Sequence, residues 1–324
     1  VLTDEDGAYA FPVDDDTIIF VNKPAGYMTP VTDDQLPRFH YIHKPEGSPD
    51  LKYPGVEPTG PLPESIDFPL RAHEDREQFR VLLFGDTQPY SMQEIHWIAR
   101  DGVSLGDLVG DQLDFFEHVN AVNAMVGVPF YNILGNHDID FASPNDEHSD
   151  ETFEAVYGPP YYAFAYGKAH FLVLDDVEWT GERYYGLLGE EQLAFVENYL
   201  KHVPADSLIV PLMHIPLVDV EDRARLLELI EPFENTFSLA AHWHRQIHFF
   251  MDEEDGWTGE EPHHHLVHAT VCGSWWNGFK DPVGIPVTTM SDGAPNGYSF
   301  LTIDGTDYAV TFKAARRPAD HQMH

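Results

Sequence analysis

The stretch Gly135-Asn136-His137-Asp138 directly follows an apolar run, residues 130–134, whose length suits a buried strand. Four other short motifs surround it, and each ends or directly follows a similar apolar run, at residues 81–84, 103–105, 208–213 and 237–241. A buried strand followed by a polar residue is how α/β folds present side chains at the carboxyl ends of a sheet. The four motifs are Gly85-Asp86-Thr87-Gln88, Gly106-Asp107-Leu108-Val109-Gly110-Asp111, Met213-His214 and Ala241-His242-Trp243-His244.

The polar side chains of these motifs form a mixed set of metal donors. They comprise carboxylates, amides and imidazoles, which together suit Mn, Fe or Zn. Any one of these residues is as well explained as a turn or cap residue, because Asp and Asn favour such places. Taken together and in this order, they predict a site for two metal ions.

In content and order, the five motifs resemble the signature of the calcineurin-like metallophosphoesterases, which usually reads D-x-H, GD, GNHD, H and GHxH. Two positions depart from it, since Gln88 stands in a histidine slot and Ala241 in a glycine slot. The resemblance covers roughly residues 79–250, and the flanks resemble more loosely the terminal domains of one bacterial branch. It implies an α/β fold (an α+β sandwich), with a two-layered mixed β-sheet core flanked by helices and small β-rich N- and C-terminal domains.

The resemblance also implies a role for each motif residue. Asp107 would bridge two divalent or trivalent ions (Mn, Fe or Zn, with Mg as a further candidate). A hydroxide bridging the metals would attack phosphorus, and His137, oriented by Asp138, would assist the leaving group. The remaining ligands would be Asp86, Gln88 and His244 at the first metal and Asn136, His214 and His242 at the second. Because the Gln88 amide replaces an imidazole, we expect weaker binding of Zn relative to Mn, Mg or Fe.

The resemblance therefore predicts hydrolysis of small-molecule phosphate esters, with monoesters and diesters left open. The alternative is a non-catalytic scaffold of the same fold that acts as a protein-binding module. Such a scaffold usually loses ligands or the non-ligand histidine, whereas this chain keeps His137 and all seven ligand positions. An adhesive or carbohydrate-binding role would have to reside in residues 1–70, which are too short to support it.

Composition excludes some partners. The formal net charge of the 324 residues is −37, which repels nucleic acid and anionic membranes at low salt. The charge is explained equally well by a saline habitat and by simple solubility. No apolar stretch reaches the length of a membrane span. Export to the periplasm or the exterior is expected from the resemblance alone, and the oligomeric state is not predicted.

Three segments are expected along the chain. Residues 1–70 read as a partial β-sandwich, with strands at 8–11 and 17–21, followed by a proline-rich linker or strap at 44–70. Residues 71–255 form the metallophosphoesterase core, with helices at 112–126, 189–201 and 221–230 and a hairpin at 161–175. Residues 256–324 form a β-rich C-terminal domain with strands at 266–271, 298–303 and 308–312.

Several residues outside the ligand set invite a functional reading. We interpret His263-His264-His265, with His268, as a polar strand edge, or else as a group from which one imidazole reaches the mouth of the active site. We expect Trp275 and Trp276 to join the C-terminal domain to the core, and Trp243 to line the cleft. Asp111 is expected to be a helix N-cap, and the single cysteine, Cys272, a core residue.

Overall fold

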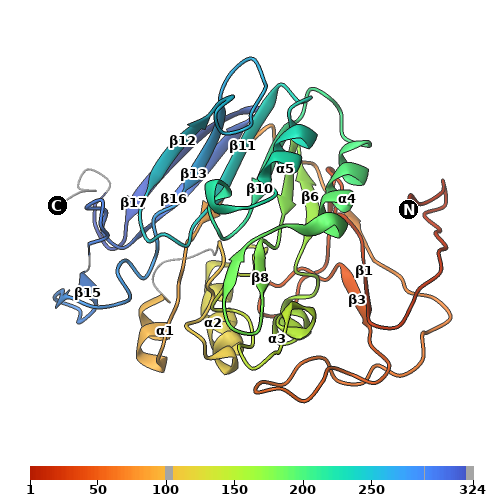
Figure 1. Cartoon of the computed structure of the whole chain (residues 1–324), viewed down its shortest axis with the longest axis horizontal. Helices are drawn as coiled ribbons and strands as arrows, with labels where there is room; N and C mark the ends of the chain where they lie inside the picture. Colours follow the sequence, from red (N-terminus) through yellow and green to blue (C-terminus); the bar gives the residue numbers. More distant parts are fainter. Residues whose placement is uncertain (99–104, 288, 319–324) are drawn as a thin grey trace.

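Two β-sheets packed face to face form the centre of the protein in the computed structural model, which describes residues 1–98, 105–287 and 289–318. The larger sheet has the order β12-β13-β11-β10-β7-β6, and the smaller has the order β17-β16-β5 (Figure 1). The larger contains β6 (Tyr162–Tyr166), β7 (Ala169–Val173), β10 (Leu208–Leu212), β11 (Asn235–Ala240), β12 (Ile247–Met251) and β13 (His263–Val267). The smaller contains β5 (Gln78–Leu83), β16 (Gly297–Asp304) and β17 (Asp307–Ala314).

The strand directions place the carboxyl ends of four strands at one edge of the larger sheet. Strands β13, β11, β10 and β7 run parallel, whereas β12 and β6 pair antiparallel at the two sides. The smaller sheet is antiparallel throughout. Its side chains Leu83, Leu301 and Ile303 are buried against the larger sheet. The apolar layer between the sheets fixes their relative position, because burying each such side chain stabilises the fold by about 1.5–3 kcal/mol.

Helices cover the outer face of the larger sheet and the region below its strand ends. The α-helices in the described residues are α1 (Met92–Ile98), α2 (Phe116–Asn123), α3 (Glu151–Tyr157), α4 (Gly189–Leu200) and α5 (Arg223–Ile230). On α4, residues Leu193, Val196 and Leu200 recur at helical spacing, and they are buried with the side chains of α5 against the sheet. Helices α1, α2 and α3 lie along the lower part of the molecule (Figure 1).

Shorter elements complete the described chain. The 3-10 helices are η1 (Leu113–Phe115), η2 (Ala124–Val126), η3 (Asp146–His148) and η4 (Leu217–Asp219). Two-stranded pairs join β1 (Thr17–Phe20) to β3 (His40–His43), β2 (Tyr27–Met28) to β4 (Arg71–Ala72), β8 (Val177–Trp179) to β9 (Tyr184–Gly186) and β14 (Phe279–Lys280) to β15 (Pro286–Val287).

The expected fold class is confirmed, since a mixed sheet in a two-layer core is flanked by helices. The helices expected at 112–126, 189–201 and 221–230 and the hairpin at 161–175 are present within a few residues. Two expected strands are wrong, because residues 8–11 and 130–134 form none. The backbone of Phe130 instead bonds to the carbonyl of Gln35, in a loop. Most of the strand expected at 103–105 lies outside the described residues.

Hydrogen bonding crosses the predicted domain boundaries. Strand β13 is an interior strand of the larger sheet, and β16 pairs with β5, so residues 256–324 supply strands to both core sheets. At the other end, the proline-rich segment is a strap, because Lys44 forms a buried ion pair with Glu151 of α3 and the Tyr53 N–H donates to Asp140 at 2.9 Å. The exact division into 1–70, 71–255 and 256–324 stays a prediction.

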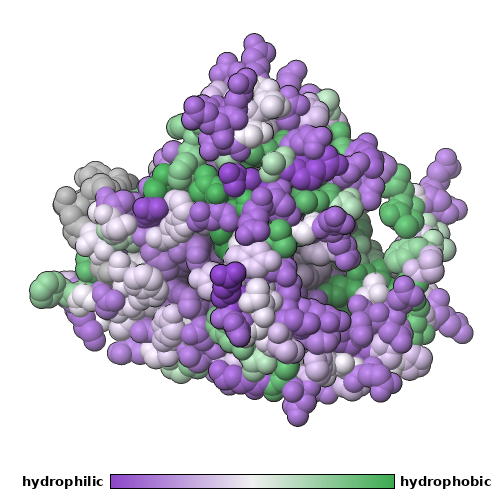
Figure 2. Space-filling model, viewed as in Figure 1, coloured by the Kyte–Doolittle hydropathy of each residue, from purple (hydrophilic) through white to green (hydrophobic). Residues whose placement is uncertain are grey.

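The surface reflects the composition. Hydrophilic residues cover most of the face seen in Figure 2, as expected for a formal charge of −37. In the described part of the chain, no helix combines the length and apolar character needed to cross a bilayer.

Candidate metal centre

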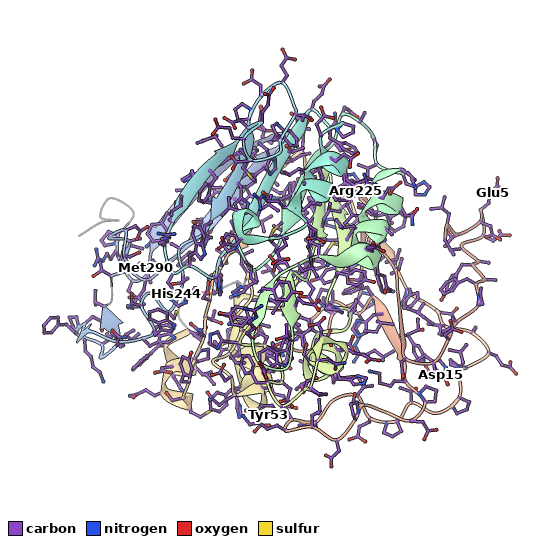
Figure 3. The ribbon with its side chains drawn as sticks, in the orientation of Figure 1. Glu5, Asp15, Tyr53, Arg225, His244 and Met290 are labelled. Atoms are coloured by element: carbon purple, nitrogen blue, oxygen red, sulfur yellow. The ribbon has the colours of Figure 1, made fainter. Side chains whose placement is uncertain are left out.

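The five motifs meet where the parallel strands end. His214 follows β10, and His242 and His244 follow β11. Asp86 follows β5 of the smaller sheet, whose end is tied to the larger sheet because the N–H of Val271 donates to the carbonyl of Gly85 at 2.8 Å. His244 accordingly lies near the lower ends of the strands in Figure 3. The sheet edge thus brings together residues that are up to 158 positions apart in sequence.

All seven predicted ligands lie in one cluster, in which the backbone N–H of His242 joins Asp86 to the other residues at 3.2 Å. Asp107, His214 and His242 each offer one ligand atom, and these atoms lie within 4.8 Å of one another. The group is nearly buried, since Asp86, Gln88, Asp107, Asn136 and His214 are at most 2% exposed. The closest contacts are His214 Nε2 to Asn136 Oδ1 at 3.1 Å, to Asp107 Oδ1 at 3.2 Å and to His242 Nδ1 at 3.2 Å, Asp86 Oδ1 to His244 Nε2 at 3.4 Å, and Gln88 Nε2 to Asp107 Oδ2 at 3.4 Å.

The hydrogen bonds of two histidines favour metal binding. His214 Nδ1 lies 3.1 Å from the carbonyl oxygen of Leu105, and His244 Nδ1 lies 2.7 Å from that of Gly273. A carbonyl can only accept, so each Nδ1 carries a proton and each Nε2 is the nitrogen that faces the cluster. This is the arrangement by which proteins orient a metal-ligating imidazole.

The charges around the cluster call for a cation. The buried Asp86 Oδ1 has only the long, 3.4 Å contact with His244 Nε2 and no well-formed hydrogen bond within the described chain. Burial alone would lower the pKa of His214, but the carboxylate of Asp107 raises it to about 10. Burial alone would likewise raise the pKa of Asp107, but His214 and His137 outweigh it and hold that pKa below its usual range. A buried carboxylate needs a positive partner, and a metal ion supplies that charge as well as a proton does. The residues present therefore fit a metal site.

Backbone strain is concentrated in the same place. Asp86, Gln88, Asp107, His242 and His244 all have positive φ angles, between 38° and 66°. Non-glycine residues in this region cost roughly 1–3 kcal/mol each and persist where the surrounding structure enforces them. Five of the seven predicted ligands thus have a locally unfavourable backbone conformation, which the structure around the site maintains.

Gln88 occupies its predicted position with its amide nitrogen toward the cluster. Its Nε2 donates to Asp107, while its Oε1 faces the Cys272 thiol at 3.8 Å. Only the amide oxygen can bind a metal, so ligation by Gln88 requires the amide to turn by half a rotation. Its role as a ligand stays a prediction.

The prediction that Asp138 orients His137 is wrong. His137 Nδ1 instead lies 2.5 Å from Asp111 Oδ1, and its Nε2 lies 4.0 Å from Asp107 Oδ2. Asp111 is not the expected helix N-cap, because the residue that precedes η1 is Gln112. Burial lowers the pKa of His137, but the Asp107 and Asp111 carboxylates overcome this and raise it above its ordinary value.

Asp138 has a structural role. Its carboxylate accepts the backbone N–H groups of Leu108 at 3.0 Å, Val109 at 3.1 Å and Gly135 at 3.0 Å. These bonds join the second motif to the third. Between them, the backbone of Gly135 passes so close that a Cβ there would lie 2.2 Å from the Asp107 nitrogen, which only glycine avoids. Asp138 therefore acts on Asp107 and His137 by fixing the loops that carry them.

Sequence reasoning missed a buried carboxylate that supports the site. Asp176 accepts the N–H groups of His214 at 3.2 Å and Ile215 at 3.1 Å. Burial raises the pKa of Asp176 to about 7. An available signal was its position three residues after β7, close to the place that His214 takes two residues after β10.

The interpretation of His263-His264-His265 as a polar strand edge is wrong. Their strand, β13, is flanked by β11 and β12, and His263 and His265 are at most 1% exposed. The N–H of Leu217 donates to His265 Nε2, and the Ser238 hydroxyl lies 2.7 Å from His265 Nδ1 and 2.8 Å from His263 Nε2. The imidazoles of His263 and His265 therefore belong to an internal hydrogen-bond network. The residues that follow β13, and not β13 itself, reach the site.

The remaining singled-out residues divide between packing and the site. Trp276 is buried and its Nε1 donates to the carbonyl of Thr87 at 2.8 Å, so the expected packing role is confirmed. Trp275 is instead 52% exposed and stacks on His244. The side chain of Trp243 donates to Asp219 at 3.0 Å, beside the ligand motif that contains it. Cys272 is fully buried, which agrees with the core role.

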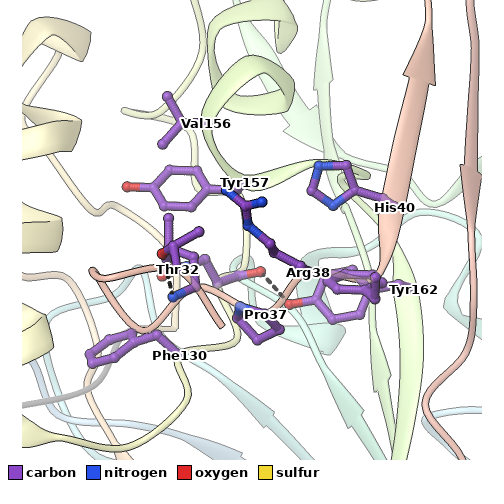
Figure 4. A pocket seen from close by; sticks show the side chains of 11 residues that line it. Thr32, Pro37, Arg38, His40, Phe130, Val156, Tyr157 and Tyr162 are labelled. Atoms are coloured by element: carbon purple, nitrogen blue, oxygen red, sulfur yellow. Dashed lines mark hydrogen bonds between the residues drawn. The ribbon is translucent and has the colours of Figure 1, made fainter. Parts of the chain in front are cut away.

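A cavity of about 270 Å³ lies apart from these residues, and none of the predicted site residues lines it. The N-terminal segment supplies Thr32, Pro37, Arg38 and His40, which face Tyr157 at the end of α3 (Figure 4). The Tyr162 hydroxyl closes one side by donating to the carbonyl of Asn132 at 2.9 Å.

Comparison with known proteins adds a family match at the C-terminal end. Residues 265–324 match the model described as the C terminal of Calcineurin-like phosphoesterase. No curated protein matches the sequence.

Three solved structures show a partial likeness. The structure of PhoD has a TM-score of 0.49 at 14% identity, over 76% of this chain and 72% of that chain. The metallophosphoesterase from Sphaerobacter thermophilus has a TM-score of 0.34 at 12% identity, over 74% and 90% of the two chains. Vacuolar Protein Sorting 29 from Cryptosporidium parvum has a TM-score of 0.32 at 13% identity, over 73% and 97%.

The family match covers β16 and β17, which complete the smaller sheet beside β5. The five motifs follow the order of the family signature. They converge at the carboxyl ends of β5 and of the parallel strands. Residues 265–324 thus match the model for the C-terminal part of the calcineurin-like phosphoesterases, and the five motifs before them follow the order of that family's signature.

Proposed function

We propose that this protein hydrolyses small phosphate esters with the help of two metal ions. The family match of residues 265–324 supports metal-dependent hydrolysis of phosphate esters in general. The seven side chains that meet at the strand ends would hold the ions, with Asp107 between them. Bound there, two metals would supply an activated water and neutralise the charge that develops on the phosphoryl oxygens.

The observation that carries the proposal is the position of His137. Its side chain is 25% exposed, and its Nε2 faces Asp107 at 4.0 Å, within the site but outside the ligand set. Asp111 engages Nδ1, so the proton that can be transferred is the one on Nε2. Burial lowers the pKa of the ring, but two carboxylates outweigh it and raise the pKa, which favours the protonated form. His137 is therefore arranged to protonate the oxygen of the departing group.

Metal analysis and kinetics on His137→Gln test this role. The variant should keep the metal content of the parent protein, while turnover of an alkyl phosphate ester falls by roughly 10²–10⁴-fold. An aryl ester with an acidic leaving group should lose less, because its departing oxygen needs less protonation. The matched control is His118→Gln, an exposed histidine on α2, which should behave like the parent.

Three results would contradict parts of the proposal. Loss of metal in His137→Gln would make His137 a ligand. Unchanged turnover of both esters would remove it from the mechanism. Metal binding by the parent without turnover of any phosphate monoester or diester would favour a non-catalytic scaffold that binds other proteins.

A further inference from the structure

Three exposed aromatic side chains stand around the metal centre, and we call Tyr90, Tyr184 and Trp275 the aromatic rim. They are 39%, 36% and 52% exposed, respectively. They come from separate parts of the chain, because Tyr90 precedes α1, Tyr184 begins β9 and Trp275 lies between β13 and β14. Aromatic side chains of this size are usually largely buried in proteins. Three exposed ones at one site therefore need an explanation.

Each ring of the rim contacts a different histidine of the centre. The Tyr90 and Tyr184 rings stand nearly perpendicular to their partners, at 80° and 83°, whereas Trp275 stacks at 27°. The ring centroids are 6.4 Å apart for Tyr90 and His137, 5.9 Å for Tyr184 and His242, and 4.4 Å for Trp275 and His244. The rim therefore adjoins both the predicted ligands and the residue placed at the leaving group.

The surrounding structure fixes two of the rings. The Tyr90 ring packs directly over Gly110, where a Cβ would lie 2.6 Å from its carbon atoms. Trp275 has a φ of 56°, a strained value for tryptophan, and its neighbour Trp276 is anchored by the bond to Thr87. The backbone thus holds Trp275 out of the core, although a buried position would stabilise so large an apolar ring.

The carboxylates beside Tyr90 favour an uncharged partner at that part of the rim. The N–H of Tyr90 donates to the Glu94 carboxylate at 2.6 Å, and Asp111 lies against His137 next to the same ring. None of the three rim side chains is positively charged. An organic group with several negative charges would meet these carboxylates, whereas a neutral aromatic ring would be held by stacking and edge contacts.

We propose that the aromatic rim is a substrate subsite that selects phosphate esters of uncharged aromatic alcohols. This inference rests on the proposed function, because it assigns the organic part of the substrate to the same site. Tyr90, Tyr184 and Trp275 grip the aromatic group while the phosphoryl group meets the metal-binding residues. The rim residues set specificity and take no part in the chemical step.

Equilibrium binding of two non-hydrolysable probes tests the subsite without relying on turnover. Phenylphosphonate and methylphosphonate share a headgroup and differ only in the ring, so isothermal titration calorimetry on metal-loaded protein isolates the contribution of the rim. The parent should bind phenylphosphonate at least about tenfold more tightly than methylphosphonate. Trp275→Ala should weaken phenylphosphonate binding by about 3- to 10-fold, the range of one aromatic contact, and leave methylphosphonate unchanged.

The matched control is Phe250→Ala. Phe250 is a 64% exposed aromatic residue on β12 that stacks on His264 away from the centre. This variant should bind both probes like the parent. Tyr184→Ala provides a second rim variant on another element, so the test does not depend on the folding of one protein.

The outcomes separate the two proposals. Equal affinity of the parent for both probes, or unchanged phenylphosphonate binding in both rim variants, would overturn the subsite while leaving phosphoester hydrolysis intact. A parent that takes up metal and binds neither phosphonate would contradict the proposed function and, with it, the subsite.

Discussion

Replacing Asp111 with asparagine is expected to change the pH dependence of catalysis without changing metal content. The substitution keeps a hydrogen-bond acceptor 2.5 Å from His137 Nδ1 and removes its negative charge. Because the carboxylate raises the pKa of His137, its loss lowers that pKa. A general acid is active only below its pKa, so the descending limb of the kcat profile should move to lower pH.

The size of the shift follows from the exposure of the pair. The side chains of His137 and Asp111 are 25% and 39% exposed, so solvent screens much of their attraction. A screened ion pair of this kind contributes at most about 1 kcal/mol, which is roughly a fivefold change in an equilibrium constant. We therefore expect Asp111→Asn to move the limb to lower pH and to lower turnover of an alkyl ester up to about fivefold at pH values above the limb.

Asp138→Asn is the decisive comparison, because Asp138 was the residue that the sequence favoured for this role. It should leave the limb in place and lower the free energy of unfolding by about 1–3 kcal/mol, since an amide NH2 replaces one of the two oxygens that accept these three backbone N–H groups. The measurements are kcat against pH, metal content and denaturant unfolding for both variants. An unshifted limb in Asp111→Asn together with a shifted limb in Asp138→Asn would refute the assignment.

Three further outcomes are expected. Asp107→Ala should lose both metals and melt at a lower temperature than the metal-loaded parent; two metals per chain by elemental analysis would show that Asp107 is no bridge. Gly135→Ala should destabilise the fold by more than 1 kcal/mol in urea, because its Cβ would lie 2.2 Å from the Asp107 backbone, and equal stability would contradict that contact. Burial lowers the pKa of both His263 and His265 to about 3 in the folded protein. In the unfolded chain these histidines bind protons as the pH falls below about 6.5, which favours unfolding. That costs roughly 1 kcal/mol of stability per histidine by pH 5.5, and NMR titration midpoints near 6.5 would disprove it.

Much of the site could be predicted because its determinants are local. An apolar run of strand length followed by a polar residue marks a strand end, and parallel strands necessarily align such ends at one edge. The positions after β5, β10 and β11 therefore identified Asp86, His214, His242 and His244 before any contact was known. The helical spacing on α4 was equally local, since its apolar residues must share one face.

Contacts between distant segments decided what the sequence left open or misassigned. Nothing in the spacing distinguishes Asp111 from Asp138 as the partner of His137, because the choice depends on which way each loop turns after its strand. Asp138 is nearer in sequence, yet its carboxylate points back to the N–H groups of the second motif. The three consecutive histidines looked like a strand edge because their polarity is a local property. Their burial comes from β11 and β12 on either side.

The sequence by itself determined the residue types of the candidate metal site, the strand-end positions of those after β5, β10 and β11, and the α/β class, because periodicity and motif order are properties of the chain itself. Only the tertiary structure decided that Asp111 engages His137 and that Asp138 ties loops together. It also decided that Trp275 stands exposed beside His244, while its neighbour Trp276 is buried. The physical reason is that hydrogen-bond partners and exposure depend on where separate strands and loops meet in space, which no local pattern records.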